Sequence, residues 1–216
     1  MEWVRVKLGY DGVLSVEPQG RSGGLAILWK DVVHAKLLSF SQNHVDMEVV
    51  TNGMMNWRLT GFYGEPMRHL RKRTWDLLRN LSRDSNLPWC VVGDMNNITS
   101  QVDTRGGANY PRWLIDGFNE TISEVRLTGM DLVGHQYTWE KGRGTQTWIE
   151  TRMDRALASK SWFDMFPLAK LYTWRIVKDS WNANSNSSIV EKIQRCGERL
   201  GPWGKDVTGK FRNRIK

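Results

Sequence analysis

The sequence predicts an α/β protein in which mixed β-sheets and helices pack as a sandwich, followed by a helical appendage with a basic face. Up to about residue 172, short apolar runs bounded by turn formers are interspersed with amphipathic segments. Several neighbouring strand candidates are joined by tight turns, which favours mixed over purely parallel sheets. We therefore expect one α/β domain over residues 1–172 and a basic helical segment over residues 173–216.

The first third of the chain contains three strand candidates and one helix. Leu25–Trp29 is a compact apolar run preceded by glycines, which is typical of a short buried strand. Val45–Val50 alternates loosely, and the Asn52-Gly53 pair after it is the strongest short hairpin signal. Trp57–Tyr63 is then the return strand. Arg68–Arg83 carries leucines at helical spacing with basic residues between them, so an amphipathic surface helix is expected.

The middle of the chain continues the same alternation. Leu87–Val92 is a second buried strand, and Trp113–Val125 has an apolar helical face. Tyr137–Trp139 and Thr147–Met153 look like two strands joined through a glycine-rich turn. Ala156–Phe166 is expected to be a short helix.

The last segment has a different character. Residues 182–188 form a polar linker, and Ser188 to Glu191 has the pattern of a helix capping box. Ile189, Ile193, Cys196 and Leu200 then follow at spacings that make one helical stripe. A helical appendage is therefore expected here.

Composition excludes several classes of protein. The chain has 216 residues, 40% hydrophobic and 25% charged, which is ordinary for a globular domain and too apolar for a disordered tail. No run approaches the ~18 apolar residues of a membrane span, so no membrane partner is expected. Two cysteines, Cys90 and Cys196, are too few for a disulfide framework or a cysteine-ligated zinc site, which favours a reducing, intracellular setting.

The charge of the chain is unevenly distributed. The formal net charge is +8, and residues 173–216 contain ten Lys and Arg against four Asp and Glu, a net of +6. The remaining 172 residues therefore contribute only +2. A basic segment is the usual footprint of polyanion binding, although solvated basic faces are also common.

The segment Gly93-Asp94-Met95-Asn96 follows a buried strand directly. Asp94 and Asn96 are two residues apart, so in extended chain both side chains point to the same side. A carboxylate and an amide aimed at one place can hold a divalent cation and orient a phosphate oxygen. The alternative is a turn rich in Asp and Asn that merely ends the strand, and this alternative is favoured on the tetrapeptide alone.

Three further strand ends carry polar or aromatic side chains. Tyr63 ends a strand and is able to donate to a phosphate, although a half-buried tyrosine is the commoner fate there. Asp154 lies between Arg152 and Arg155, which equally fits a surface ion-pair cluster. Trp139 is a candidate for stacking on a ligand, with a core position as the more common alternative.

Taken together and in this order, these segments resemble the endonuclease/exonuclease/phosphatase (DNase-I-like) superfamily. The likeness is greatest to the endonuclease domain of plant LINE-type non-LTR retrotransposon polyproteins. It covers nearly the whole chain, with the tail resembling the helical connector of such polyproteins. The segments that carry the likeness are residues 20–29, 59–66, 87–96, 137–139 and 152–157.

The resemblance implies a four-layer α/β sandwich and magnesium-dependent phosphodiester cleavage of DNA, with no small-molecule cofactor. Tyr63 would contact the scissile phosphate, and Asp94 and Asn96 would surround the metal and the attacking water. Asp154 would match the carboxylate that orients the base histidine. A retrotransposon product of this kind would act in the nucleus. The residues expected to contact DNA are Arg152, Arg155, Trp139, Lys205, Lys210, Arg212 and Arg214.

The sequence also departs from the family pattern. The family places its metal-binding Glu on an early strand that has no counterpart here, and its base histidine follows an Asp late in the domain. No Asp-His pair occurs in this chain, whose histidines are His34, His44, His69 and His135. We therefore expect an incomplete, marginally stable sandwich, a weak or absent Mg²⁺ site and little activity. Two alternatives remain open: a non-catalytic nucleic-acid-binding module that uses the basic tail, and a relic without function.

Overall fold

A six-stranded mixed sheet forms the centre of the protein. The computed structural model describes residues 1–18, 24–30, 33–51, 53–173 and 191. The strand order in the main sheet is β3-β4-β5-β6-β12-β8, with bounds β3 (Val33–Ser41), β4 (His44–Thr51), β5 (Trp57–Tyr63), β6 (Trp89–Asp94), β12 (Asp154–Ser159) and β8 (Leu127–Gly129). Of its five pairings only β5–β6 is parallel, so β5 and β6 end at the same edge of the sheet.

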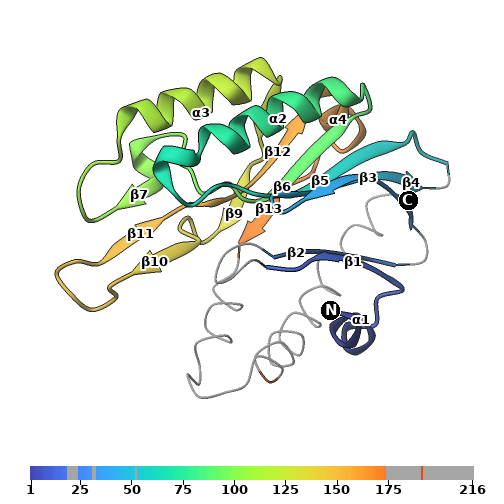
Figure 1. The fold of residues 1–216 in the computed structure, drawn as a ribbon, viewed down its shortest axis with the longest axis horizontal. Coiled ribbons are helices and arrows are strands. Elements are labelled where there is room, and N and C mark those ends of the chain that lie inside the picture. Colours follow the sequence, from blue (N-terminus) through green and yellow to red (C-terminus); the bar gives the residue numbers. More distant parts are fainter. Residues whose placement is uncertain (19–23, 31–32, 52, 174–190, 192–216) are drawn as a thin grey trace.

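Two helices cover one face of this sheet. The 3-10 turn η1 (Arg68–Leu70) and helix α2 (Lys72–Asp84) form the crossover between β5 and β6, as a parallel pair requires. Helix α3 (Arg112–Glu124) lies beside α2 (Figure 1). Between them and the sheet lies the largest core cluster, which includes Phe62, Leu78, Val91, Leu114, Phe118 and Leu157, all at most 2% exposed.

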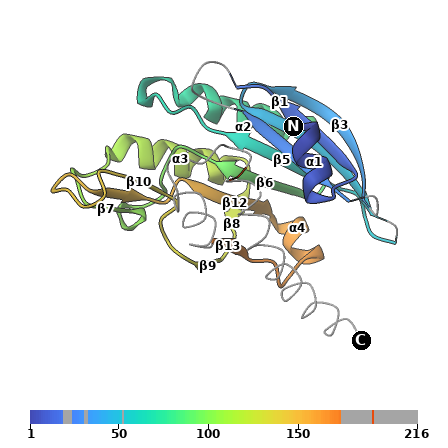
Figure 2. The ribbon, with the colours of Figure 1, turned by 90° about the horizontal axis from the view of Figure 1, so that it is seen from below.

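The opposite face of the main sheet is covered by smaller elements. The hairpin of β1 (Gly12–Val16) and β2 (Leu25–Trp29) packs on β4, with helix α1 (Glu2–Leu8) outside it (Figure 1). Helix α4 (Lys160–Met165) packs below β6 and β12, beside the parallel pair β9 (Leu132–Gly134) and β13 (Leu171–Thr173) (Figure 2). The architecture is therefore a mixed α/β sandwich with several sheets.

This second face is incompletely covered at its centre. Val92 lies in the middle of the main sheet, on the same side of β6 as the buried Cys90, yet it is 37% exposed. Its register partner on β5 is Gly61, which packs against Ile27 of the β1–β2 hairpin. Val92 thus lies between the part covered by β1–β2 and the part covered by α4, and the described residues leave it open.

A smaller, three-stranded sheet extends from the end of the main sheet. It has the order β10-β11-β7, with bounds β10 (Trp139–Lys141), β11 (Ile149–Thr151) and β7 (Thr104–Arg105). The β10–β11 hairpin projects beyond the main sheet (Figure 1). Since β11 runs almost directly into β12, this small sheet is anchored at the edge where β6 ends.

Most expected elements are present, but two expectations were wrong. Ala156–Phe166 is not one helix, because its first residues belong to β12 and only Lys160–Met165 is helical. Leu25–Trp29, expected as a buried strand, is a strand but contains no fully buried residue, because it pairs only with β1 in the two-stranded β1–β2 sheet. The linker and the Ile189–Leu200 stripe predicted in the tail lie outside the described residues, apart from Glu191.

The structure also bears on the expectations about cysteines and membrane spans. Cys90 is buried without a disulfide, and burial raises the pKa of its thiol to about 12. No helix in the described part of the chain has the length and apolar character needed to cross a membrane.

Candidate functional site

Three of the residues singled out in the sequence lie at the ends of three adjacent strands. Tyr63 ends β5 and is the register partner of Asp94, which ends β6. Asp154 begins β12 and is also a register partner of Asp94, from the other side. Asn96 follows two residues after Asp94, and its side chain donates to the carbonyl oxygen of Gly64, next to Tyr63, at 2.8 Å. The structure therefore brings Tyr63, Asp94, Asn96 and Asp154 together at one edge of the main sheet.

Two glycines allow the strands to approach closely at this edge. A side chain at Gly93, where φ is +151°, would place its Cβ 2.0 Å from the carbonyl oxygen of Phe62 on β5. At Gly64 a Cβ would lie 2.1 Å from the carbonyl oxygen of Met95. Both distances are far below van der Waals contact. The glycines before Asp94 and after Tyr63 are therefore required for the geometry that joins the two residues.

The Asp94–Asn96 segment forms a tight turn that orients both side chains. The backbone N–H of Asn96 donates to Oδ1 of Asp94 at 2.8 Å, and its Nδ2 donates to Oδ2 of Asp94 at 3.1 Å. Asn96 has a φ of +47°, a conformation that asparagine tolerates better than most residues. Because the amide nitrogen of Asn96 is used in this way, its Oδ1 remains available as an acceptor. The turn interpretation and the site interpretation of this tetrapeptide are thus compatible.

The carboxyl group of Asp94 has an unusual proton affinity. Burial, with a smaller effect of the nearby Asp154 carboxylate, raises its pKa to about 6 against the lowering effects of Asn96 and Arg71. Asp94 is costly to charge, and a second carboxylate beside it adds repulsion. A bound cation would reduce both costs. A raised pKa of this kind is typical of acids at functional sites, which makes Asp94 a candidate functional residue.

Asp154 is positioned by a residue that the sequence argument did not single out. The hydroxyl oxygen of Thr138 accepts hydrogen bonds from the backbone N–H groups of Met153 and Asp154, both at 3.0 Å. Met153 in turn accepts a hydrogen bond from the N–H of Met95 at 2.9 Å. These bonds fix the backbone at the start of β12, while the side chain of Asp154 is exposed. Thr138 lies within the Tyr137–Trp139 segment, in which only Trp139 was a candidate site residue.

A buried polar network lies next to the site, on the face of the main sheet that α2 and α3 cover. The Arg71 guanidinium donates to Oδ1 of Asn97 at 3.1 Å and also contacts the hydroxyl of Tyr110. Arg71 further donates to the carbonyl oxygen of Glu65, and Asn97 donates to that of Leu114 in α3. These bonds tie the loop after β5, the loop after β6 and α3 together. Burial lowers the pKa of Arg71 to about 10, which leaves it charged at neutral pH.

The residues expected to contact DNA differ in their exposure to solvent. Trp139 is 43% exposed on β10, and Arg152 is half-buried just before Asp154. Arg155 was a wrong choice, because it is 6% exposed and pairs with the buried Asp103 at 2.5 Å. Its side chain faces Asp103 inside the protein, and its Nε is buried with no hydrogen-bond partner among the described residues. The tail residues Lys205, Lys210, Arg212 and Arg214 lie outside the described residues.

The family's magnesium ion can be tested against the donors present. Mg²⁺ prefers oxygen ligands and commonly takes one or two carboxylates with water completing its shell. Asp94, Asp154 and the free amide oxygen of Asn96 fit that pattern in type. However, no group of three or more His, Cys, Asp or Glu side chains is placed to hold a metal in the part of the chain that the structure describes. The donors fit a weakly held, largely hydrated cation.

The four histidines either contact other residues or are exposed. His44 is buried, and its ring nitrogens are engaged by the hydroxyls of Ser39 and Ser41 at 2.9 and 2.7 Å. His135 lies 3.9 Å from Glu150, and His34 and His69 are exposed. Within the described residues, no hydrogen bond or ion pair joins any histidine to Tyr63, Asp94, Asn96 or Asp154.

Comparisons with known proteins agree with this arrangement of strands. Among solved structures, the endonuclease domain of TRAS1, a telomere-specific non-LTR retrotransposon, aligns with a TM-score of 0.57 at 15% identity, over 72% of this chain and 70% of that chain. This similarity shows a DNase-I-like fold. The 3′ phosphatase NExo from Neisseria bound to a product DNA hairpin has a TM-score of 0.45 at 16% identity, over 72% of this chain and 70% of its own. A β-hairpin deletion mutant of beta toxin from Staphylococcus aureus also has a TM-score of 0.45, at 15% identity, over 79% and 70% of the two chains.

No curated protein sequence matches the chain. The family model described as the Endonuclease/Exonuclease/phosphatase family, in contrast, matches residues 3–166, well over half of the sequence. The chain therefore belongs to the endonuclease/exonuclease/phosphatase family.

Proposed function

We propose that this chain is a retrotransposon-type endonuclease domain that binds a DNA phosphate at the Tyr63–Asp94–Asn96–Asp154 edge and cleaves it only at a trace rate. The observation that carries the proposal is the register of the three strand ends, which sets two carboxylates, a phenol and an amide around one place. Family membership supports phosphodiester chemistry there. Such a domain would act on nuclear DNA.

Each side chain has a role that follows from its chemistry. The phenolic O–H of Tyr63 donates to a non-bridging phosphate oxygen. The carboxylate of Asp94 and the amide oxygen of Asn96 orient a water molecule toward the phosphorus. Asp154 adds a second negative charge that favours a cation at the same place. A bound Mg²⁺ would supply Lewis-acid stabilisation of the phosphate charge.

The slow rate follows from the missing base. A positioned general base contributes typically 10²–10⁴-fold to such reactions. The described residues offer no histidine at the edge, and the carboxyl of Asp94 is partly protonated near pH 6. Without a base and with a weakly held cation, the rate is expected to lie on the order of 10³-fold or more below that of a complete site.

A second candidate, non-catalytic nucleic-acid binding, is favoured by one surface beside the same edge. The Arg105 guanidinium lies 5.5 Å from the ring centroid of Tyr137 and 5.7 Å from that of Trp148, and it also pairs with Glu150. Trp148 and Trp139 are 37% and 43% exposed. Exposed aromatic rings interleaved with arginine suit base stacking on single strands. The basic tail would add phosphate contacts that depend on salt.

One experiment separates the two candidates. Purified full-length protein is incubated with supercoiled plasmid and Mg²⁺ or Mn²⁺, with and without a chelator, while DNA binding is measured at two salt concentrations. The first candidate predicts trace nicking that the chelator abolishes and that Asp94→Ala removes. Asp131→Ala, which removes an exposed carboxylate elsewhere, should leave the nicking unchanged. If the protein binds DNA in a salt-sensitive way but shows no nicking that Asp94→Ala removes, the second candidate is favoured and the first is contradicted.

A further inference from the structure

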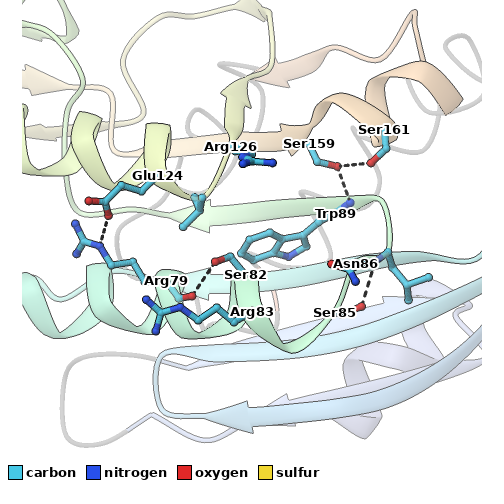
Figure 3. A pocket seen from close by; sticks show the side chains of 12 residues that line it. Arg79, Ser82, Arg83, Ser85, Asn86, Trp89, Glu124, Arg126, Ser159 and Ser161 are labelled. Atoms are coloured by element: carbon cyan, nitrogen blue, oxygen red, sulfur yellow. Dashed lines mark hydrogen bonds and ion pairs between the residues drawn. The ribbon is translucent and has the colours of Figure 1, made fainter.

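A large polar cavity lies at the opposite end of β6 from the candidate site. Its volume is about 820 Å³, and its walls come from the end of α2, the end of α3, the start of β6 and the start of α4 (Figure 3). Trp89 begins β6 and Asp94 ends it, so roughly 17 Å of strand separates the two places. We call this space the arginine cavity, after Arg79, Arg83 and Arg126 in its walls.

The arginine cavity carries excess positive charge. Arg79 forms an ion pair with Glu124 and lies 3.1 Å from Asp76. Arg83 and Arg126 are exposed, and neither has an acidic partner among the described residues. The C-termini of α2 and α3 face the same space, and each contributes roughly half a negative charge. Among the residues that line the cavity, three guanidinium groups face one carboxylate and two helix ends, so the walls carry a net charge of about +1.

Hydroxyl groups on the opposite wall add donors. Ser159 Oγ accepts hydrogen bonds from the N–H groups of Trp89 at 3.0 Å and Trp162 at 3.3 Å, so its proton points away from them. Ser161 Oγ lies 3.0 Å from Ser159 Oγ (Figure 3). If Ser159 donates to Ser161, the proton of Ser161 is left to point toward the cavity. Guanidinium groups and a hydroxyl therefore face one space from two sides.

We propose that the arginine cavity binds the phosphate monoester group of a small molecule. Guanidinium groups match phosphate oxygens with paired N–H donors, and a tetrahedral oxyanion accepts hydrogen bonds from several directions at once, which suits donors on two walls. The cavity is much larger than one phosphate ion and has the size of small-molecule pockets. Apolar parts of Leu87, Trp89 and Val125 also line it, and these can contact the rest of a phosphorylated molecule such as a nucleoside monophosphate.

The test uses the full-length protein and three probes: inorganic phosphate, a deoxynucleoside 5′-monophosphate and the same deoxynucleoside without phosphate. Binding is measured by calorimetry and by changes in indole N–H signals in NMR spectra. Arg83→Gln with Arg126→Gln removes two exposed charges from the cavity. Lys7→Gln with Lys36→Gln removes two exposed charges on α1 and β3 as a matched control. Asp94→Asn reports any binding at the other end of β6.

The expected result is binding of the monophosphate that weakens on the order of tenfold, or about 1.4 kcal/mol, in the double arginine variant, since two solvent-exposed guanidinium groups are removed. The lysine control should stay within about twofold of the wild type, and any part of the binding that Asp94→Asn changes is assigned to the candidate site at the other end of β6. Equal affinity for inorganic phosphate and the monophosphate would show that the phosphate group alone is recognised. The proposal is overturned if the nucleoside binds as well as its monophosphate, if both double variants weaken binding equally, or if the wild type binds no probe. In the last case the arginines only compensate the two helix ends.

Discussion

The two faces of the main sheet differ in how completely they exclude water. On the face covered by α2 and α3, burial is tight enough to enclose ion pairs, such as Arg58–Asp46 with side chains 1% and 2% exposed. On the other face, Val92 is 37% exposed at the centre of the sheet. On the helix-covered face, the bonds of Arg71 to Glu65 and Asn97 join the loops that follow β5 and β6, next to the strand ends of the candidate site. The site edge therefore keeps its geometry even though one side of the sandwich is thinly covered.

The largest expected effect comes from breaking a buried ion pair on the helix-covered face. Arg58 lies 2.7 Å from Asp46 and also donates to the carbonyl oxygen of Leu81 near the end of α2. Arg58→Met would leave Asp46 charged and buried, which typically costs about 3–5 kcal/mol. Denaturant unfolding measures the loss. The double variant Arg58→Met with Asp46→Leu should recover most of it, and a loss in the double variant as large as in the single one would contradict this explanation.

A direct comparison of the faces uses two truncations to alanine. Leu114 in α3 is fully buried, so Leu114→Ala should cost about 2–5 kcal/mol. Ile27 on β2 is half-buried over Gly61, so Ile27→Ala should cost only about 1 kcal/mol. Unfolding free energies of both variants give the difference. Equal losses would mean that the β1–β2 hairpin is packed as firmly as the helices.

The acid at the site should make stability depend on pH. The folded-state pKa of Asp94 is raised to about 6, so its folded carboxyl keeps a proton that the unfolded chain has already released. The Asp94 contribution to stability is therefore greatest near pH 4 and is lost as the pH rises through 6. Asp94→Asn should be more stable than the wild type at pH 7, by roughly 1 kcal/mol after allowance for partial solvent screening, and nearly equal to it at pH 4. Melting temperatures at both values test this, and a variant that is less stable at pH 7 would contradict it.

The smallest effect is expected at the open centre of the second face. Val92 already contacts water, so Val92→Ser should change the unfolding free energy by less than about 0.5 kcal/mol. The wild type should nevertheless bind a hydrophobic dye more strongly than the variant, because apolar surface is exposed there. Unchanged dye binding would show that this apolar surface is covered in solution.

Strand ends were predictable from the sequence, but the burial of individual side chains was not. Tyr63 and Asp94 follow clear strand signals with glycine beside each, so their meeting at one edge follows from a parallel β5–β6 pair. Arg155 looks like a surface arginine in the sequence, and only the pairing of β12 with β6 shows that it faces Asp103 inside. Such long-range ion pairs leave no local pattern.

The wrong helix over Ala156–Phe166 has a similar cause. Its first residues, Ala156 to Ala158, are good helix formers, and local propensity therefore favours a helix. In the structure they lie between β6 and β8 and are buried on both sides of the sheet, which overrides propensity. The arginine cavity also could not be predicted from the sequence, because its walls come from four separate elements.

The central claim, a phosphate site without its general base, is tested most directly by chemical rescue. The rate of metal-dependent plasmid nicking by the wild type is measured with increasing imidazole at constant pH and ionic strength. Our account predicts a trace rate that rises with the concentration of the free imidazole base, and no rise in Asp94→Asn. A rate comparable to that of an intact family member without imidazole, or a trace rate that imidazole does not change, would contradict it.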